Sequence, residues 1–160
     1  MTKAGNLTGN GVIEGTLAPD FEIAELRKKL SDFRGKNIVI YFYPRDFTPG
    51  CTLEAEEFSL DYPKYQEKKI EIIGVSPDDE KSHNRFKNKM NIPFILTSDT
   101  RNEISKSYGV YGLKKFMDKE YFGVERTTFL LDKNGVILKV FHKVKPKGHS
   151  RDVLKYFSTI

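Results

Sequence analysis

The chain has 160 residues, 38% hydrophobic and 31% charged, a composition typical of one globular domain that buries a core without disulfides. Its net charge is +5, but acidic residues are interleaved with the basic ones and there is no zinc-finger, RNP or recognition-helix pattern. We therefore expect no nucleic-acid partner. No run approaches the roughly 18 apolar residues of a membrane span, and the start lacks the apolar region of a signal peptide. We expect a soluble cytoplasmic protein, with residues 1–14 as a flexible tail and residues 15–160 as one domain.

Strand and helix patterns alternate along the chain. Buried strands are indicated by nearly unbroken apolar runs, and helices by apolar residues at helical spacing in polar stretches. An Asn-Gly turn signal at Lys133-Asn134-Gly135 indicates a hairpin. In chain order we predict a strand at 36–44, a helix beginning near Thr48, a strand at 70–76, a helix at 78–90, a strand at 93–99, a short helix at 101–110, two strands within 125–141, and a helix at 149–160 capped by Ser150.

The first predicted helix carries one apolar stripe. Thr48 is expected to cap it, and Pro49 suits its first position, where a missing N–H costs little. Pro63 should kink or split the helix, so that the stripe belongs to two short helices. The stripe consists of Cys51, Ala55, Phe58, Tyr62 and Tyr65.

The alternation predicts parallel strands joined by right-handed crossovers, with the hairpin as an antiparallel edge. The fold class is therefore α/β, of the thioredoxin-like type, with a central mixed sheet flanked by helices. No G-x-G-x-x-G or Walker A pattern follows a strand, so we expect no nucleotide cofactor. His83, His142 and His149 lie far apart in the sequence, and they indicate no metal site.

Cys51 is the only cysteine of the chain. A free cysteine on a core stripe is most often an inert small hydrophobe. This one, however, is predicted in the first turn of a helix that follows the carboxyl end of a central strand. Free N–H groups and the positive end of the helix dipole favour a thiolate there, and the thiolate is the nucleophilic form. The residues around Cys51 distinguish an inert core cysteine from a reactive thiolate.

Pro44, Thr48 and Cys51 form the pattern P-x-x-x-T-x-x-C, which resembles the active-site signature of the peroxiredoxins, thiol peroxidases with a thioredoxin fold. The resemblance covers roughly residues 15 to 160 and is closest to the Q subfamily, which includes the bacterioferritin comigratory proteins. Four collinear blocks carry it: "DFRGKNIVIYFYPRDFTPGCTLEAEEF", "IIGVSPDDEKSHNRFKNKMNIPF", "YGVYGLKKF…YFGVERTTFLLD" and "KVKPKGH".

The resemblance implies a role for each of five residues. Cys51 would be the peroxidatic nucleophile, which becomes a sulfenic acid. Arg126, in "VERTTF", would stabilise the thiolate and hydrogen-bond the peroxide. The Thr48 hydroxyl would form hydrogen bonds with the peroxide, and Pro44 would shield the thiolate from water. Glu54 would orient the arginine, although a Glu in a first turn is also a plain partner of the helix dipole.

The sequence departs from the subfamily pattern at Glu56. Members often carry a resolving cysteine at this position, five residues after the first, and this chain has no other cysteine to replace it. We therefore expect a one-cysteine mechanism with no cofactor. The sulfenic acid would be reduced by an external thiol, namely thioredoxin, glutaredoxin or a small thiol, or would pair with Cys51 of a second subunit. The expected state is a monomer or weak homodimer, and Phe47 is expected at the mouth of the peroxide pocket.

Three alternatives compete with a peroxidase of this type. A dithiol oxidoreductase needs C-x-x-C, but Thr48 stands where the first cysteine would be. A peroxidase of the glutathione-peroxidase type would share the fold but lack the set of Pro44, Thr48 and Arg126. A redox-sensing or holdase-like protein would use Cys51 only as a switch. Arg126 together with Thr48 favours turnover, because these groups activate the peroxide as well as the thiol.

Overall fold

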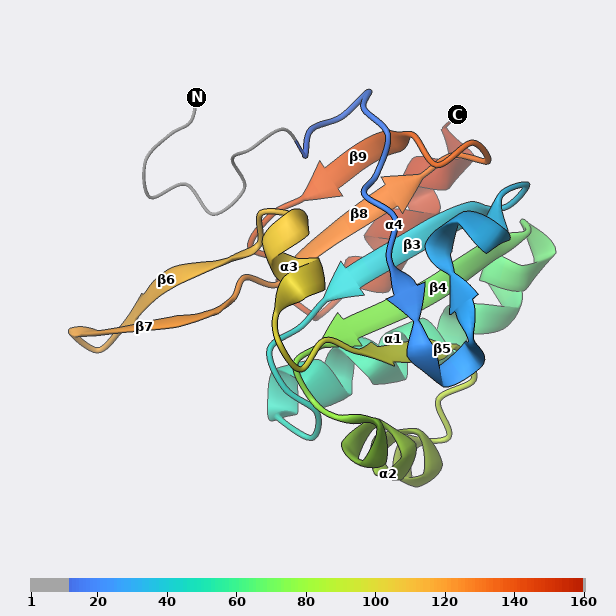
Figure 1. Cartoon of the computed structure of the whole chain (residues 1–160). Coiled ribbons are helices and arrows are strands. Elements are labelled where there is room, and N and C mark those ends of the chain that lie inside the picture. Colours follow the sequence, from blue (N-terminus) through green and yellow to red (C-terminus); the bar gives the residue numbers. More distant parts are fainter. Residues whose placement is uncertain (1–11, 160) are drawn as a thin grey trace.

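The structure is a computed structural model that describes residues 12–159. Residues 1–11 of the predicted tail lie outside the described residues, so the tail stays a prediction. Figure 1 shows one central sheet with helices on both sides and a long hairpin that projects from the body. Among the described residues, no helix is long and apolar enough to cross a membrane.

The central sheet has five strands in the order β5-β4-β3-β8-β9. Strand β3 pairs parallel with β4 and antiparallel with β8, so the sheet is mixed, as predicted. The predicted parallel unit and the antiparallel edge are both confirmed. The five strands are β3 (Asn37–Phe42), β4 (Ile70–Ser76), β5 (Ile95–Ser98), β8 (Thr127–Leu131) and β9 (Ile137–Phe141).

Strand β3 is buried on both faces, and its side chains divide between two cores. Val39 and Tyr41 face the core that contains Cys51, whereas Ile38 and Ile40 face the core on the other side of the sheet. This alternation is the period of two that a strand imposes on its side chains. It explains why the sequence of β3 is an unbroken apolar run.

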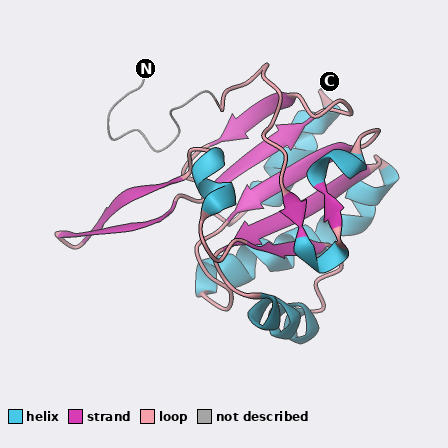
Figure 2. Ribbon diagram, viewed as in Figure 1, coloured by secondary structure: helices cyan, strands magenta, loops and turns pink. Residues whose placement is uncertain are grey.

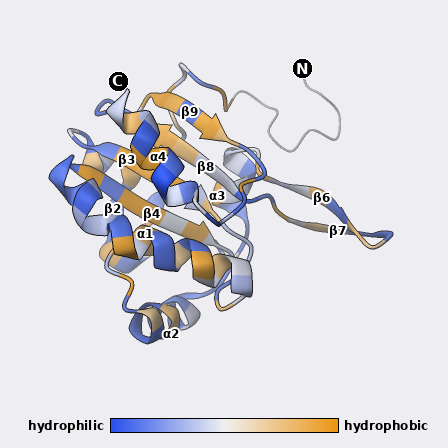
Figure 3. Ribbon diagram, turned by 180° about the vertical axis from the view of Figure 1, so that it is seen from behind, coloured by the Kyte–Doolittle hydropathy of each residue, from blue (hydrophilic) through white to orange (hydrophobic). Residues whose placement is uncertain are grey.

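Three helices cover the face that carries Cys51. They are α1 (Pro49–Glu67), α2 (Glu80–Met90) and α4 (His149–Ser158). Figure 3 shows α1 and α4 side by side in front of the sheet, and α2 packs beside β5 and α1. The opposite face is covered by α3 (Glu103–Ser107) and by an N-terminal layer of β1 (Glu22–Ile23), η1 (Ala24–Leu26), β2 (Lys28–Lys29) and η2 (Leu30–Phe33).

Two details of the predicted helices are wrong. Helix α1 is not split at Pro63, because Pro63 lies on its exposed side while Tyr62 and Tyr65 anchor the last turn to Glu71 and Ser150 by hydrogen bonds. The cap of α4 is Gly148 rather than Ser150. Gly148 has a φ of 79°, a conformation that glycine adopts without strain.

Strands β6 (Tyr111–Phe116) and β7 (Lys119–Val124) were not predicted. They pair only with each other and form the arm that leaves the body of the molecule in Figure 2. The arm exposes large apolar side chains, which is unusual for strands outside a core. These side chains are Leu113, Phe116, Met117, Tyr121 and Phe122.

Candidate active site

The register of the central sheet brings two distant parts of the sequence to one edge. Strand β3 ends at Phe42, which is the register partner of Thr127, the first residue of the antiparallel strand β8. The loop after β3 and the residue before β8 therefore meet at the same edge. Arg126 precedes Thr127, and the loop after Phe42 leads through Pro44 to α1.

Cys51 lies in the first turn of α1, where Thr48 is the N-cap and Pro49 opens the helix, as predicted. The cysteine is a free thiol that is only 1% exposed. The Arg126 Nη2 atom donates to its Sγ atom over 3.3 Å, although the two residues are 75 positions apart. The sulfur is part of the buried core cluster, but it also lies at a helix start with a guanidinium in contact, an electropositive environment of the kind in which reactive thiols are found.

Glu54 holds the other side of the same guanidinium. The Arg126 Nη1 atom donates to Glu54 Oε1 over 2.6 Å, and the Glu54 side chain is 1% exposed. Burial raises the pKa of Glu54 to about 7, even though the charge and hydrogen bond of Arg126 favour its ionised form. Burial also works against the charge of Arg126, but Glu54 and Cys51 outweigh it and raise the pKa of Arg126. Arg126 therefore stays a cation held between a carboxylate and a sulfur.

Thr48 and Pro44, from the loop before α1, share a hollow with Arg126. The hydroxyl of Thr48 donates to the carbonyl of Arg45 over 3.0 Å and makes no hydrogen bond to the N–H groups of α1. Thr48 therefore occupies the N-cap position, but the predicted capping by its side chain is wrong. Thr48, Pro44 and Arg126 together line a hollow of about 820 Å³. Arg126 thus joins the predicted site residues: it contacts Cys51 and Glu54, which do not line the hollow, and it lines the hollow together with Thr48 and Pro44.

Aromatic side chains of the β6–β7 arm also line this hollow. They are Tyr111, Phe116, Tyr121 and Phe122, and Lys114 of the arm lines the hollow with them. Phe47, which was expected at the mouth, instead packs against Phe86 of α2 with ring centroids 5.0 Å apart, and it does not line this hollow. The contribution of the arm to the hollow was not predicted, because strands β6 and β7 were not predicted.

Gly50 is a further site residue that the sequence analysis did not single out. A Cβ atom at this position would lie 3.2 Å from Arg126 Nη2 and 3.5 Å from Pro146 Cγ. The lack of a side chain therefore leaves room for the guanidinium beside Cys51. The signal was present in "TPGC", where a glycine directly precedes the reactive residue.

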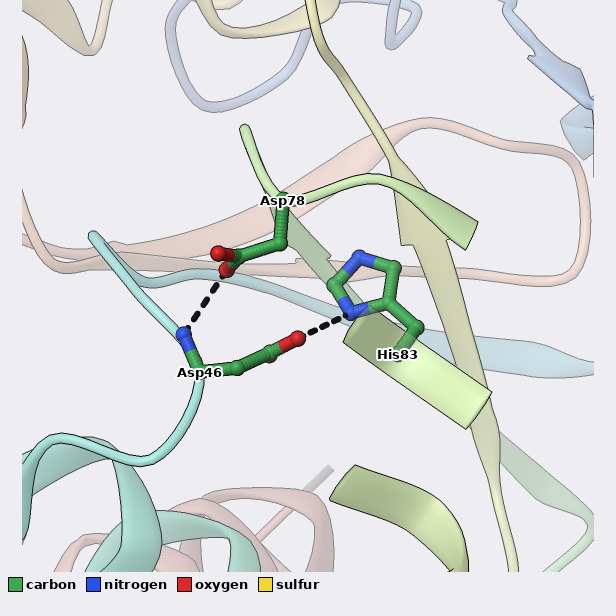
Figure 4. A group of neighbouring side chains, drawn as sticks. All are labelled: Asp46, Asp78 and His83. Carbon is green, nitrogen blue, oxygen red and sulfur yellow. Dashed lines mark hydrogen bonds and ion pairs between the residues drawn. The ribbon is translucent and has the colours of Figure 1, made fainter. Parts of the chain in front are cut away.

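A second polar cluster adjoins the loop and was also missed by the sequence analysis. Ligand atoms of Asp46, Asp78 and His83 lie within 4.8 Å of one another (Figure 4). Their oxygens already accept hydrogen bonds from the protein, among them bonds from Tyr43 and Ser76. Their geometry does not support a cation site.

Comparison with known proteins agrees with this geometry. The chain matches the AhpC/TSA family over residues 15–140. It is 46% identical over 144 residues to peroxiredoxin Bcp of Bacillus subtilis, covering 88% of this chain and 92% of that one. It is 38% identical over 155 residues to the chloroplastic peroxiredoxin Q of Suaeda salsa, covering 93% of this chain and 69% of that one.

A solved structure gives the same result. The bacterioferritin comigratory protein of Xanthomonas campestris, studied for its alkyl peroxide reduction activity, superposes with a TM-score of 0.79 at 36% identity and covers 83% of this chain and 85% of that one. The thioredoxin-like fold predicted from the alternation of elements is therefore confirmed.

Proposed function

Because this chain belongs to the AhpC/TSA family and is a peroxiredoxin, a thiol-dependent peroxidase, we propose that Cys51 is the residue that attacks the peroxide. The observation that carries this assignment is the 3.3 Å contact between Arg126 Nη2 and Cys51 Sγ. It supplies a cation to the thiolate at the point where α1 begins. The substrates are hydrogen peroxide and organic hydroperoxides.

In the first step, the Cys51 thiolate attacks the terminal oxygen of the peroxide. A sulfur–oxygen bond forms and the oxygen–oxygen bond breaks, so the sulfur is oxidised to a sulfenic acid and the peroxide is reduced to an alcohol or water. The leaving oxygen carries negative charge until it takes up a proton. Arg126, whose side chain is 16% exposed, is the fixed cation that stabilises this charge.

The other site residues position these groups. Glu54 fixes the guanidinium plane through its 2.6 Å bond to Nη1, which leaves Nη2 for the sulfur and the substrate. The Thr48 hydroxyl donates to the Arg45 carbonyl and keeps its lone pairs for the peroxide O–H. Pro44 contributes no N–H to the hollow and limits the access of water to the thiolate.

The second half of the cycle requires an outside thiol. Glu56 is exposed on α1 and carries a carboxylate where a resolving thiol could have stood. An external thiol therefore attacks the sulfenic sulfur and releases water, and a second thiol breaks the resulting mixed disulfide to restore Cys51. Thioredoxin, glutaredoxin and small thiols are the candidate reductants. Pairing of two Cys51 residues is the other route, and it would link the chains of a weak homodimer; the monomeric or weakly dimeric state and the cytoplasmic location stay predictions.

Peroxide consumption with dithiothreitol as reductant tests the proposal. The wild type should turn over, and Cys51→Ser should not. Mass spectrometry after one equivalent of peroxide should show 16 Da added to Cys51 in the wild type, the mass of one oxygen. A wild type that is oxidised once but shows no turnover with thiol would favour a redox sensor. Turnover by the serine variant would remove Cys51 from the reaction.

A further inference from the structure

The loop between β3 and α1 is tied to helix α2 through a buried pair, Asp46 and His83 (Figure 4). Asp46 lies two residues before Thr48 and is 4% exposed, while His83 is 1% exposed. The His83 Nδ1 atom lies 2.8 Å from Asp46 Oδ2. Peroxide chemistry as described above gives neither residue a role, although burying two ionisable groups is costly unless they are paired.

The partners of His83 identify its protonation state. Its Nε2 atom lies 3.1 Å from the carbonyl oxygen of Thr97, which can only accept a hydrogen bond. Both oxygens of Asp46 already accept, Oδ1 from the Tyr43 hydroxyl and Oδ2 from the Ser82 hydroxyl, as an ionised carboxylate does. Nδ1 must then donate as well. With two N–H groups facing acceptors, His83 is an imidazolium cation.

The charges around His83 agree with this assignment. Burial disfavours the cation, but the hydrogen bond and charge of Asp46 outweigh it, so the pKa of His83 is raised above its ordinary value. Further negative charge comes from elements on two other sides. The facing groups are Asp46 from the loop, Asp78 from the segment after β4, Glu25 from η1, and the neutral phenol of Tyr43.

The pair fixes the conformation of the loop. Besides the bond to His83, Asp46 donates its backbone N–H to Asp78 Oδ2 over 2.7 Å, and Phe47 packs against Phe86 of α2. Phe47 has a φ of 68°, which is unfavourable for a residue with a side chain, so this backbone must be held by its surroundings. Thr48 follows directly, and its hydroxyl donates to the carbonyl of Arg45 in the same loop.

We propose that His83, as a cation paired with Asp46, is a positioning residue for peroxide reduction, which holds the loop of residues 44–48 so that Thr48 and Pro44 meet the substrate beside Cys51. The proposal rests on the peroxidase mechanism given above. His83 does not touch the substrate and acts only through Asp46. Loss of its proton leaves the buried Asp46 carboxylate without a cationic partner and leaves one hydrogen bond fewer at either Asp46 or Thr97.

The expected pH dependence has a definite sign. A histidine whose folded pKa is raised stabilises the fold fully below the ordinary pKa of about 6.5, and this stabilisation is lost as pH rises through the raised value. Loop order, and with it the rate of peroxide reduction, should follow the same direction. Thiolate formation by Cys51 has the opposite direction, since it increases with pH.

The test measures the second-order rate constant of wild type and His83→Gln with hydrogen peroxide from pH 5.5 to pH 9. The ratio of the two constants at each pH cancels the effect of thiolate formation. Below the pKa of His83 the wild type should be about tenfold faster, the cost expected of a misplaced active-site group, and the ratio should approach one at high pH. The control is His142→Gln, because His142 is also near a carboxylate, Glu125 at 3.5 Å, but is exposed. This control should match the wild type throughout.

A direct titration keeps the proposal testable if His83→Gln does not fold. The chain has three histidines, so single variants assign their imidazole signals in NMR spectra. His83 should titrate above pH 6.5 in the wild type and lower in Asp46→Asn, and Ser82→Ala should lower the rate less than Asp46→Asn does. A His83 that is neutral at pH 6, or a wild-type to variant ratio that does not change with pH, would overturn the proposal. A wild type without peroxide reactivity would instead overturn the proposed function.

Discussion

Replacing Arg126 by lysine keeps the positive charge at the site but removes the planar guanidinium, whose two terminal nitrogens can donate to two partners at once. The guanidinium serves two partners at once, Glu54 Oε1 at 2.6 Å through Nη1 and Cys51 Sγ at 3.3 Å through Nη2. A single ammonium cannot reproduce this geometry. It should stay with Glu54, because that carboxylate is fully buried and its second oxygen has no hydrogen-bond partner within residues 12–159. The sulfur then loses one charge-assisted hydrogen bond, worth about 1.5 to 3 kcal/mol, and peroxide attack should slow by about 10- to 150-fold.

Competition with a reference haem peroxidase for hydrogen peroxide measures this loss. The method suits the chain because it has no tryptophan to report oxidation by fluorescence. Arg151→Lys, on the exposed surface of α4, is the matched control and should leave the rate unchanged. A rate constant of Arg126→Lys within a factor of two of the wild type would show that the fork is not needed and would refute the assignment of Arg126.

Three further predictions follow from burial and close contact. Gly50→Ala places a Cβ atom 3.2 Å from Arg126 Nη2 and should slow peroxide attack about tenfold. The melting temperature of this variant should not fall, because alanine favours a helix over glycine by about 1 kcal/mol. A normal rate of peroxide attack would contradict the contact. The pKa of Glu54 is raised to about 7, so the wild type should lose stability as pH rises from about 4.5 to 7, and denaturant titrations of Glu54→Gln should show a smaller loss. Burial lowers the pKa of His149 to about 4, so the free energy of unfolding should fall by about 3 kcal/mol as pH falls from 6.5 to 4. His149→Gln should remove most of this acid sensitivity. An equal loss of stability in the variant would exclude His149 as its source.

The elements near Cys51 could be predicted from the sequence because local patterns determine them. The unbroken apolar run predicted β3, although the strand ends at Phe42 and not at residue 44, and the Thr-Pro pair before Cys51 placed the helix start correctly. Arg126 was found through the family resemblance alone. Its approach to Cys51 depends on the antiparallel register of β3 and β8, and the spacing of residues along the chain does not contain that information.

The missed features depend on unusual turns and on tertiary contacts. The β6–β7 arm turns at Met117 and Asp118, which have φ values of 51° and 66°. Hairpin turns with such φ values usually contain glycine or asparagine, so Met117-Asp118 is not recognised as a turn signal in the sequence. The hydroxyl of Ser150 donates to Asp61 instead of capping α4. The Asp46–His83 pair joins residues 37 positions apart, and each of them alone has the sequence environment of an ordinary surface residue.

The exposed carboxylate of Glu56 has a consequence for how rigid the active site can be. Two cysteines five positions apart on an intact helix lie too far apart for a disulfide, which needs Cα atoms within roughly 4.4 to 6.8 Å, so a helix with two such cysteines must open in every cycle. Helix α1 has one cysteine, so no internal disulfide requires its first turn to unfold. Substitutions that strengthen this turn should therefore raise thermal stability without blocking an internal disulfide step. At this end of α1, a stable helix does not compete with the formation of an internal disulfide.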